Sequence, residues 1–368
     1  MSAEHTPERG SILIAGGGTA GHVLPGISIA RSLIDRGYQP EQIHFVGASR
    51  GIEARIVPEA GFAITLLPGR GIQRRITAEN IASVFGLIKA MFMAINLVRR
   101  TKPAAVLGLG GFASAACTLA AVLLRVPLVI AEQNARAGAV NKLTGRFARA
   151  CAVPFPDVDL PRAVVTGNPV REQIVEAASN VDKATAREQL DLPGERTVLL
   201  VFAGSLGSAR INDAVYGAVE QWRNRSDLAI YHVVGARDWD TRPDLDSGEL
   251  YYRAVRYEDR MEIAMVAADL AVCRAGGTTV AELPVMGLPG VLVPLPIATR
   301  DHQRFNAMHL VNIGGAVCVT DSEFDAQRLV TEVEAILPSI YQMSDAIRSA
   351  ARPDAADRVA DLILTSLR

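Results

Sequence analysis

The chain has 368 residues, with 38 Lys and Arg against 39 Asp and Glu, and 49% of its residues are hydrophobic. This length exceeds the roughly 250–300 residues at which a single core stops growing, so we expect two domains. The near-zero net charge argues against nucleic acid as the main partner, because neutralising phosphates needs a basic excess. The hydrophobic content excludes global disorder.

Short apolar runs alternate with helix-length segments along the first half of the chain. The first helix is expected at 24–35 and strands are expected at 11–15, 43–46, 65–67, 104–107, 128–131 and 163–166. The stretch 104–124 has no charged residue and is long enough to span a bilayer, but Gly108, Gly110 and Gly111 favour a buried strand, a tight turn and a buried helix. Continuous apolar strands separated by helices indicate a parallel sheet covered on both faces.

A second series of the same kind follows. Its strands are expected at 197–202, 230–234, 270–273, 290–295 and 316–319. The segment 339–368 is helical in pattern, with Pro353 as an interruption. We therefore predict an α/β protein of two Rossmann-like domains, 1–168 and 169–345, and a C-terminal helical segment, 346–368, that can return to the first domain.

The sequence shows no pattern of a disulfide framework, a signal peptide or a metal site. The four cysteines are scattered, without the paired spacing of a disulfide framework or a zinc site, which favours a reducing compartment. The polar stretch 1–11 does not have the pattern of a signal peptide. We expect no metal, because the sequence has no DxD-like pair in a suitable loop and no His/Cys cluster at ligand spacing.

The first expected strand ends in a glycine-rich turn. Gly16, Gly18 and Gly21 fit G-x-G-x-x-G, the dinucleotide fingerprint. The second strand ends without an acid for a ribose diol, although Ser49 and Arg50 are suited to a phosphorylated ribose. The turn alone therefore leaves an NADP-dependent oxidoreductase open.

His22 follows this turn at the start of a helix. It lies at the carboxyl end of the first strand, where open α/β sheets bind their ligands. Its imidazole can accept a proton near neutral pH, which makes it a candidate catalytic group.

The second domain has two glycine-bearing turns. The segment 204–207, Gly-Ser-Leu-Gly, lies between a strand and a helix, the usual place for a diphosphate. The segment 273–282 follows another strand, and its small residues allow backbone amides to approach a nucleotide. Glu282 at its end can accept from both hydroxyls of a ribose.

Taken in order, the motifs carry a family resemblance over roughly 12–317. They are 17–22 with Pro25, 110–114, 132–134, 166–171, 204–205, 274–282, and 302–303 with 306–307. Together they resemble the MurG family, the N-acetylglucosaminyltransferases that convert lipid I to lipid II in peptidoglycan synthesis. The resemblance implies a B-type glycosyltransferase fold, with two Rossmann-like domains facing across a cleft, and no cofactor.

The resemblance also implies roles for single residues. UDP-N-acetylglucosamine is held mainly by the C-terminal domain and the lipid-linked acceptor by the N-terminal one. Arg171 and Ser205 would contact the diphosphate, Glu282 the ribose and Gln303 the sugar. The implied donor-binding residues are Thr19, Ala20, Gly21, Asn134, Arg171, Ser205, Glu258, Gly277, Thr278, Thr279, Glu282 and Gln303, and the implied acceptor-binding residues are Gly110, Gly111 and Ser114.

Three positions depart from the family's pattern. Ala20 replaces the usual middle glycine of the first turn. Leu206 stands where many members have Gln, so any donor contact through that side chain is lost. Glu258 stands in the loop 256–261 that holds the uracil, where an aliphatic residue is frequent, which suggests that the backbone contacts the base and the side chain does not.

The family reaction converts an α-linked donor into a β-linked product, which implies one displacement with inversion and a transition state resembling an oxocarbenium ion. We expect His22 to act as the base and Asn134 to position the sugar or acceptor. An acidic residue of the N-terminal domain is the rival base. Arg171 and the helix N-terminus after Ser205 would stabilise the departing UDP.

The implied acceptor is a polyprenyl diphosphate, so we expect a peripheral protein on the cytoplasmic face of the cell membrane. Arg70, Arg74 and Arg75 precede an apolar helix at 81–98 that contains Phe85. Basic residues beside apolar ones suit anionic headgroups, so Arg74, Arg75 and Phe85 are the expected membrane residues. A plain core helix is the alternative. Cell-wall synthesis proteins are further expected partners, with roles in cell shape and division.

Other functions stay open at this point. An NADP-dependent oxidoreductase would leave the second-domain turns without a purpose. A related glycosyltransferase with a diacylglycerol or natural-product acceptor would share the fold and the donor chemistry. A sugar-nucleotide-binding regulator would leave the acceptor-side motifs unused.

Overall fold

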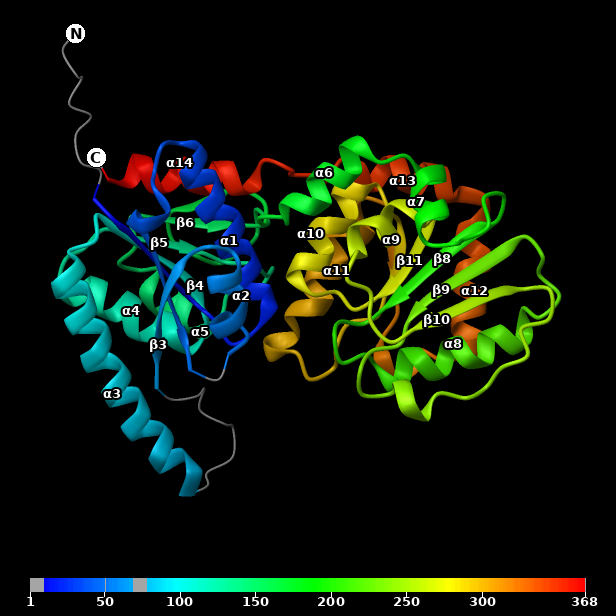
Figure 1. The fold of residues 1–368 in the computed structure, drawn as a ribbon, viewed down its shortest axis with the longest axis horizontal. Helices are drawn as coiled ribbons and strands as arrows, with labels where there is room; N and C mark the ends of the chain where they lie inside the picture. Colours follow the sequence, from blue (N-terminus) through cyan, green and yellow to red (C-terminus); the bar gives the residue numbers. More distant parts are fainter. Residues whose placement is uncertain (1–9, 50, 69–77, 368) are drawn as a thin grey trace, which may run out of the picture. The chain divides into compact units, whose positions relative to one another are not determined.

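The computed structural model describes residues 10–49, 51–68 and 78–367, and for 78–85 it describes the backbone alone. The chain divides into two compact units (Figure 1). The N-terminal unit runs to Val170 and resumes at Asp354, and the C-terminal unit is Arg171–Pro353. Each unit is built on a parallel sheet, so the predicted α/β class with two Rossmann-like domains is confirmed.

The N-terminal unit has a seven-stranded sheet in the order β3-β2-β1-β4-β5-β6-β7. Its strands are β1 (Ile12–Gly16), β2 (Ile43–Ala48), β3 (Ala63–Leu67), β4 (Ala105–Gly110), β5 (Leu128–Ala131), β6 (Ala150–Val153) and β7 (Ala163–Val165). Its helices are α1 (Ala20–Asp35), α2 (Glu53–Glu59), α3 (Ala78–Thr101), α4 (Gly111–Leu123), α5 (Ala139–Thr144) and α14 (Ala355–Ser366). The strand order reverses between β1 and β4, which is where such sheets open a ligand crevice.

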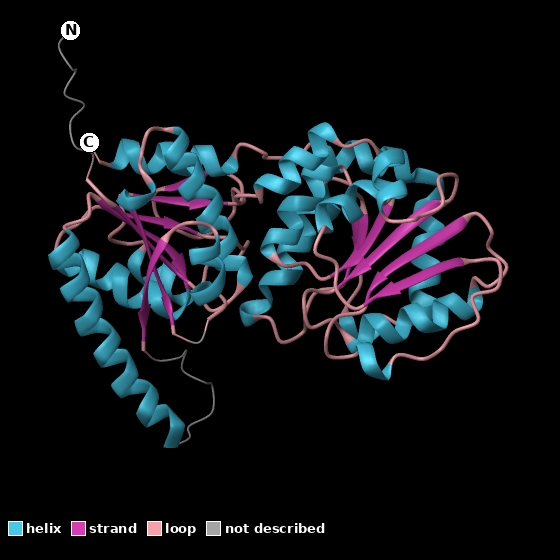
Figure 2. Cartoon of the chain, viewed as in Figure 1, coloured by secondary structure: helices cyan, strands magenta, loops and turns pink. Residues whose placement is uncertain are grey.

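Alternate residues of β1 enter two different cores, because successive strand side chains point to opposite faces of a sheet. Ile12 and Ile14 pack with α1 and α14. Leu13 and Ala15 pack with α3 and α4. Both faces of the sheet are therefore covered by helices (Figure 2).

The C-terminal helix α14 belongs to the N-terminal unit. Val359 and Ile363 are fully buried in its core. Arg36, the residue directly after α1, forms ion pairs with Asp357 at 2.7 Å and with Asp361 at 2.5 Å. The preceding helix, α13, stays with the C-terminal unit, so the chain changes unit at Pro353, later than the predicted position 345.

The C-terminal unit has a six-stranded parallel sheet in the order β10-β9-β8-β11-β12-β13. Its strands are β8 (Thr197–Phe202), β9 (Leu228–Val233), β10 (Tyr251–Val255), β11 (Leu270–Cys273), β12 (Gly290–Leu292) and β13 (Ala316–Cys318). Its helices are α6 (Glu172–Asn180), α7 (Lys183–Gln189), α8 (Ala209–Gln221), α9 (Met261–Ala267), α10 (Gly277–Met286), α11 (His302–Asn312), α12 (Ala326–Ile336) and α13 (Ile340–Arg348). Its order reverses between β8 and β11, as in the other unit.

The uncharged stretch 104–124 forms β4, a glycine turn and α4, as predicted. Among the helices formed by the described residues, none has both the length and the apolarity that crossing a bilayer requires. The sequence did not predict β6 or β10. All four cysteines are free thiols, and burial raises the pKa of Cys117 to about 12 and that of Cys151 to about 11.

Candidate active site

Two glycine turns lie together at the switch point of the N-terminal unit. One joins β1 to α1 and the other joins β4 to α4. Gly18, Gly110 and Gly111 have φ of +91°, +92° and +83°, a region that disfavours other residues. A Cβ added to Gly111 would lie 2.5 Å from the carbonyl oxygen of Gly17, so the close approach of the two turns needs glycine.

His22 faces the second of these turns. Its Nδ1 lies 3.1 Å from the Thr19 hydroxyl oxygen. A Cβ added to Gly110 would lie 3.3 Å from His22 Nε2 and 3.5 Å from Asn141 Nδ2. The structure therefore brings the expected base next to the expected acceptor-binding glycine. The expected donor-binding residues Ala20 and Gly21 begin α1, and Ala20 is exposed.

A buried carboxylate shapes the loop after β5. Glu132 is 4% exposed, and its Oε1 accepts from the backbone N–H groups of Gln133 and Asn134, both at 3.0 Å. Its Oε2 accepts from Gly138 N–H at 3.0 Å and from Asn141 Nδ2 at 2.8 Å. Glu132 thus holds both Asn134, an expected site residue, and Asn141, which the sequence analysis missed.

Two buried oxygens near these turns have no hydrogen-bond partner among the described residues: Asn141 Oδ1 and Ser114 Oγ. Asn141 lies beside Gly110, so Oδ1 is a candidate acceptor for a bound hydroxyl. Ser114 is fully buried in α4, and its hydroxyl oxygen lies on the sheet side, near Gly108. Of the three expected acceptor-binding residues, the two glycines therefore form the turn and Ser114 lies beneath it.

A cavity of about 680 Å³ opens at the carboxyl ends of β8 and β11 in the C-terminal unit. Ser205, Thr279 and Gln303 are among the residues that line it. The α8 N-terminus points its first backbone N–H groups and the positive end of its dipole to this edge of the sheet. Leu206 and Ile297 also line the cavity and are 65% and 80% exposed, so exposed apolar side chains form part of its lining.

Arg171 and Glu282 form an ion pair within this unit. Arg171 Nε donates to Glu282 Oε1 at 2.7 Å, and Glu282 is only 5% exposed. Burial lowers the pKa of Arg171, but the Glu282 carboxylate outweighs it and the net pKa is raised, so the guanidinium stays charged. Gly277 begins α10, with Thr278 and Thr279 in its first turn, so Glu282 lies on the helix that starts at the edge of the cavity.

Arg274 ties together three of the segments around the cavity. Its guanidinium donates to Ser208 Oγ at 2.6 Å and to the Val293 carbonyl at 3.1 Å, and it pairs with Asp321 at 2.6 Å. Gln303 Oε1 accepts from the Leu295 backbone N–H at 2.9 Å. No single role for Arg274 is predictable from the sequence, because its partners Ser208, Val293 and Asp321 lie far away along the chain.

Glu258 turns its side chain into the protein. Tyr231 OH donates to Glu258 Oε2, and Arg260 N–H donates to Oε1 at 2.8 Å. This agrees with the expectation that the side chain does not contact the base. It adds a function that the sequence did not indicate, since the carboxylate holds the loop 256–261 in shape.

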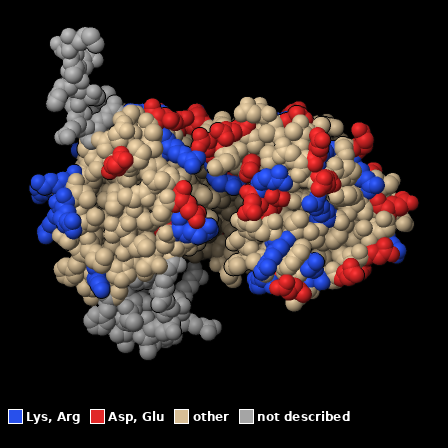
Figure 3. All heavy atoms as spheres, viewed as in Figure 1, with Lys and Arg blue, Asp and Glu red and all other residues tan. Residues whose placement is uncertain are grey.

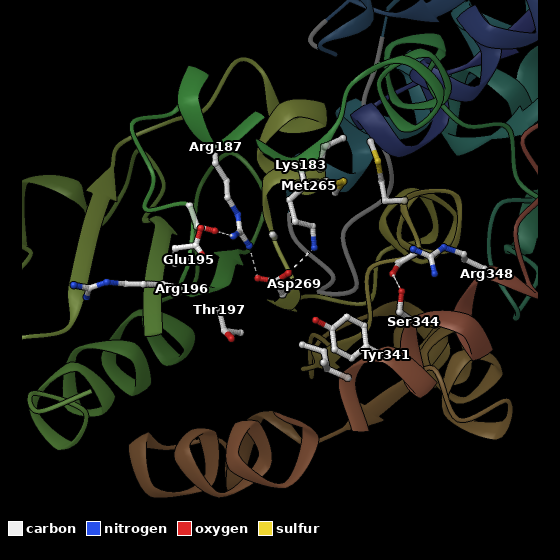
Figure 4. Close-up of a pocket in the computed structure, with 16 residues that line it drawn as sticks. Lys183, Arg187, Glu195, Arg196, Thr197, Met265, Asp269, Tyr341, Ser344 and Arg348 are labelled. Carbon is white, nitrogen blue, oxygen red and sulfur yellow. Dashed lines mark hydrogen bonds and ion pairs between the residues drawn. The ribbon is translucent and has the colours of Figure 1, made fainter. Parts of the chain in front are cut away.

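A second cavity, of about 460 Å³, lies at the amino ends of β8 and β11 in the same sheet (Figure 4). Lys183 and Arg187 point toward Asp269 and pair with it, both at 2.5 Å. Parallel sheets bind ligands at the carboxyl ends of their strands, and these cations already have an acid partner, so the cavity at the carboxyl ends of β8 and β11 is the stronger candidate for a ligand site. No group of three or more His, Cys, Asp or Glu side chains suited to a metal ion occurs in the part of the chain that the structure describes.

The expected membrane residues Arg74 and Arg75, and the side chain of Phe85, lie outside the described residues. Further along α3, Ala90, Ala94 and Val98 are buried, whereas Ile88 and Phe92 are 48% and 70% exposed. Basic side chains gather over the end of this helix (Figure 3), whose last turn has Arg99 and Arg100. The helix is thus neither a plain core helix nor uniformly polar on its outer face.

Both halves of the chain match known family models: residues 12–153 match the glycosyltransferase family 28 N-terminal domain, and residues 198–359 match its C-terminal domain. A UDP-N-acetylglucosamine–N-acetylmuramyl-(pentapeptide) pyrophosphoryl-undecaprenol N-acetylglucosamine transferase from Salinibacter ruber is 39% identical, with 96% of each chain covered. A protein of the same name from Alkalilimnicola ehrlichii is 38% identical over 97% of this chain and 99% of its own.

Solved structures of glycosyltransferases are also similar to this chain. Acinetobacter baumannii MurG matches with a TM-score of 0.77 and 29% identity, over 97% of this chain and 99% of that one. The glycosyltransferase of kitacinnamycin, at 17% identity and a TM-score of 0.73, shares the fold. These matches leave no support for the oxidoreductase alternative. The chain belongs to glycosyltransferase family 28.

Proposed function

We propose that this chain transfers N-acetylglucosamine from UDP-N-acetylglucosamine to the muramoyl-pentapeptide of undecaprenyl-diphosphate-linked lipid I, forming lipid II and UDP. The observation that carries the proposal is the full-length similarity, at 38–39% identity, to transferases that bear this activity in their names. The cavity at the switch point of the C-terminal unit supports it, because it offers a helix N-terminus and polar side chains to a sugar nucleotide.

The donor diphosphate is bound by positive groups of the C-terminal unit. The α8 N-terminus contributes about 0.3–1 kcal/mol where exposed and up to about 2 kcal/mol where partly buried. Arg171 adds about 1.5–3 kcal/mol for each charge-assisted hydrogen bond. As the bond between the sugar and the diphosphate breaks, the same groups stabilise the negative charge that builds up on UDP.

His22 of the N-terminal unit is the base. When Nδ1–H donates to the Thr19 hydroxyl, the lone pair of the imidazole is on Nε2, which faces Gly110. The acceptor hydroxyl attacks the anomeric carbon and passes its proton to Nε2, while UDP leaves with the electron pair of the broken bond. The configuration inverts, and general-base catalysis of this kind contributes about 10²–10⁴-fold. Asn134 and Asn141 position the sugar and the acceptor hydroxyls.

The chain binds an anionic membrane surface from the cytoplasmic side. The exposed Ile88 and Phe92 of α3, next to the exposed Lys89, support this part of the proposal, because apolar side chains beside cations suit the headgroup region. Each cation near such a surface contributes about 1 kcal/mol. Cosedimentation with phosphatidylglycerol vesicles should weaken for Phe92→Asp and stay unchanged for Tyr341→Asp, because Tyr341 is an exposed aromatic residue of the C-terminal unit. Equal binding by all three proteins contradicts the proposed surface.

The function itself is tested by UDP release. UDP-N-acetylglucosamine with a lipid I analogue should release UDP rapidly, and diacylglycerol in place of lipid I should not. UDP-galactose and UDP-glucose should be poorer donors. His22→Ala should lower kcat by about 10²–10⁴-fold with donor affinity unchanged. A turnover within about threefold of wild type would refute the assignment of the base. Release of UDP with diacylglycerol alone would instead indicate a related transferase.

A further inference from the structure

Glu53 is a charged side chain that is almost completely buried. It begins α2, is 1% exposed, and lies beneath the first glycine turn of the N-terminal unit. Ionised carboxylates are rarely buried unless several donors satisfy them. The partners of Glu53 therefore indicate what the residue is for.

Its carboxylate joins two loops that are far apart in the sequence. Both oxygens accept from the backbone N–H of Gly18, each at 3.0 Å. Oε1 also accepts from the N–H of Ala48, at the end of β2, at 2.7 Å. Hydrogen bonds to a charged acceptor are shorter and stronger than neutral ones, so these contacts tie the turn after β1 to the end of β2.

Three glycines make room for this side chain. A Cβ added to Gly17 would lie 2.0 Å from Glu53 Oε1, and one added to Gly51 would lie 2.0 Å from Oε2. A Cβ added to Gly47 would lie 2.3 Å from Glu53 Cγ. The carboxylate thus fills a space that exists only because these three residues have no side chain.

Glu53 is connected to His22 through Gly18 and Thr19. Gly18, held by Glu53 at φ +91°, is followed by Thr19, whose hydroxyl oxygen lies 3.1 Å from His22 Nδ1. The next residue back, Gly17, approaches Gly111 of the second turn. A shift of Gly18 would therefore move the hydroxyl that orients the imidazole, and catalytic groups lose efficiency when displaced by about 1 Å.

We infer that Glu53 is a positioning residue of the transferase: it acts through Gly18 and Thr19 to hold the His22 imidazole in its working orientation. This inference rests on the proposed role of His22. A carboxylate with a purely structural role would only accept from the backbone N–H at the end of β2. The inference instead gives the buried carboxylate of Glu53 a role in catalysis.

The test is a double-mutant cycle between Glu53→Gln and His22→Ala, with kcat and the donor KM measured for all four proteins. Gln has the size of Glu but presents an amide donor to backbone N–H groups. In the wild-type background we expect Glu53→Gln to lower kcat by about tenfold or more and to leave the donor KM within about twofold, since the proposed contacts with the donor's diphosphate and ribose belong to the other unit. In the His22→Ala background it should lower kcat by less than about twofold, because the group it orients is gone.

The matched control is Asp269→Asn. Asp269 also accepts from a backbone N–H, that of Val198 at 2.8 Å, and it pairs with Lys183 and Arg187. It directly precedes β11 and therefore lies at the amino ends of the strands, whereas the donor cavity lies at their carboxyl ends. This variant should unfold at a lower temperature with kcat unchanged. Equal losses of kcat for Glu53→Gln in the two backgrounds would overturn the inference, as would a kcat within about threefold of wild type.

One further variant and the His22→Ala result of the same cycle keep the outcomes separate. If Glu53→Gln does not fold, Gly51→Ala serves in the same cycle, because its added Cβ displaces Oε2 while every other group is retained. The same results support or overturn the inference. If the single variant His22→Ala keeps wild-type turnover, the proposed base is refuted and the inference about Glu53 with it. If His22→Ala loses turnover but Glu53→Gln does not, the base stands and the positioning role of Glu53 is refuted.

Discussion

Replacing Glu282 by Gln distinguishes a residue that binds the donor ribose from one that only neutralises Arg171. In the structure Oε1 accepts from Arg171 Nε at 2.7 Å, and the two side chains are 7% and 26% exposed. We assign Oε2 to the ribose hydroxyls. Gln keeps the size and one acceptor oxygen of Glu but loses the charge, so it weakens both sets of contacts without opening a cavity.

The two effects have different magnitudes. A hydrogen bond to a charged group contributes about 1.5–3 kcal/mol and a neutral one about 0.5–1.5 kcal/mol, so each weakened contact costs about 1–1.5 kcal/mol. Two ribose contacts then cost about 2–3 kcal/mol, which raises the Kd for UDP by about 30- to 150-fold. The single contact with Arg171 lowers the free energy of unfolding by about 1–1.5 kcal/mol, or about 2–6 °C in Tm for a unit of this size.

Titration calorimetry with UDP and thermal unfolding measure the two effects on the same samples. The matched control is Glu332→Gln on α12, whose partner Arg328 lies at 2.6 Å in the same unit; it should bind UDP as the wild type does. A lower Tm for Glu282→Gln with a UDP Kd within about twofold of wild type would refute the ribose assignment and leave Glu282 as the partner of Arg171 alone.

Three other predictions concern pH, metal and packing. Burial lowers the pKa of His232 to about 3, so between this value and about 6.5 the unfolded chain binds a proton that the native chain does not, and stability should fall by about 2 kcal/mol from pH 7.5 to pH 5. Urea unfolding should show this fall in the wild type and far less of it in His232→Gln; identical pH profiles contradict it. Because Arg171 and the α8 N-terminus supply the positive charge, excess EDTA should leave the initial rate within about twofold, and loss of activity that magnesium restores would contradict this. Ile363→Ala, in the buried face of α14, should destabilise the N-terminal unit by about 2–5 kcal/mol in denaturant unfolding, and an unchanged midpoint would show that α14 does not complete that core.

The strands whose bounds were predicted residue for residue lie inside their sheets. The apolar runs at 128–131, 197–202 and 270–273 coincide with β5, β8 and β11, because a strand covered on both faces is apolar throughout. The edge strand β10 was missed, since it is half-buried and includes Arg253. The short β6 was missed too: its small residues, Ala-Cys-Ala-Val, carry a weak strand signal, and only its neighbours in the sheet bury it.

The candidate site, too, could be predicted only in part from the sequence. Its turns follow from local pattern, because glycines after a strand and before a helix are a short-range signal. The partners of its carboxylates do not follow from local pattern: Glu53 holds a residue 35 positions away, and Glu282, although predicted as a site residue, pairs with one 111 positions away. The sequence signal that pointed to Glu53 was the pair of glycines that precedes it, Gly47 and Gly51, which leave room for its side chain.

Isolation of the products tests the proposed transfer of N-acetylglucosamine to lipid I most directly. UDP-N-acetylglucosamine labelled in the sugar is incubated with a lipid I analogue, and the lipid product and free UDP are quantified together. We expect one UDP for each labelled disaccharide-lipid, with the new linkage in the β configuration by NMR. An α linkage, release of UDP without labelled lipid, or no reaction with both substrates present would contradict the account.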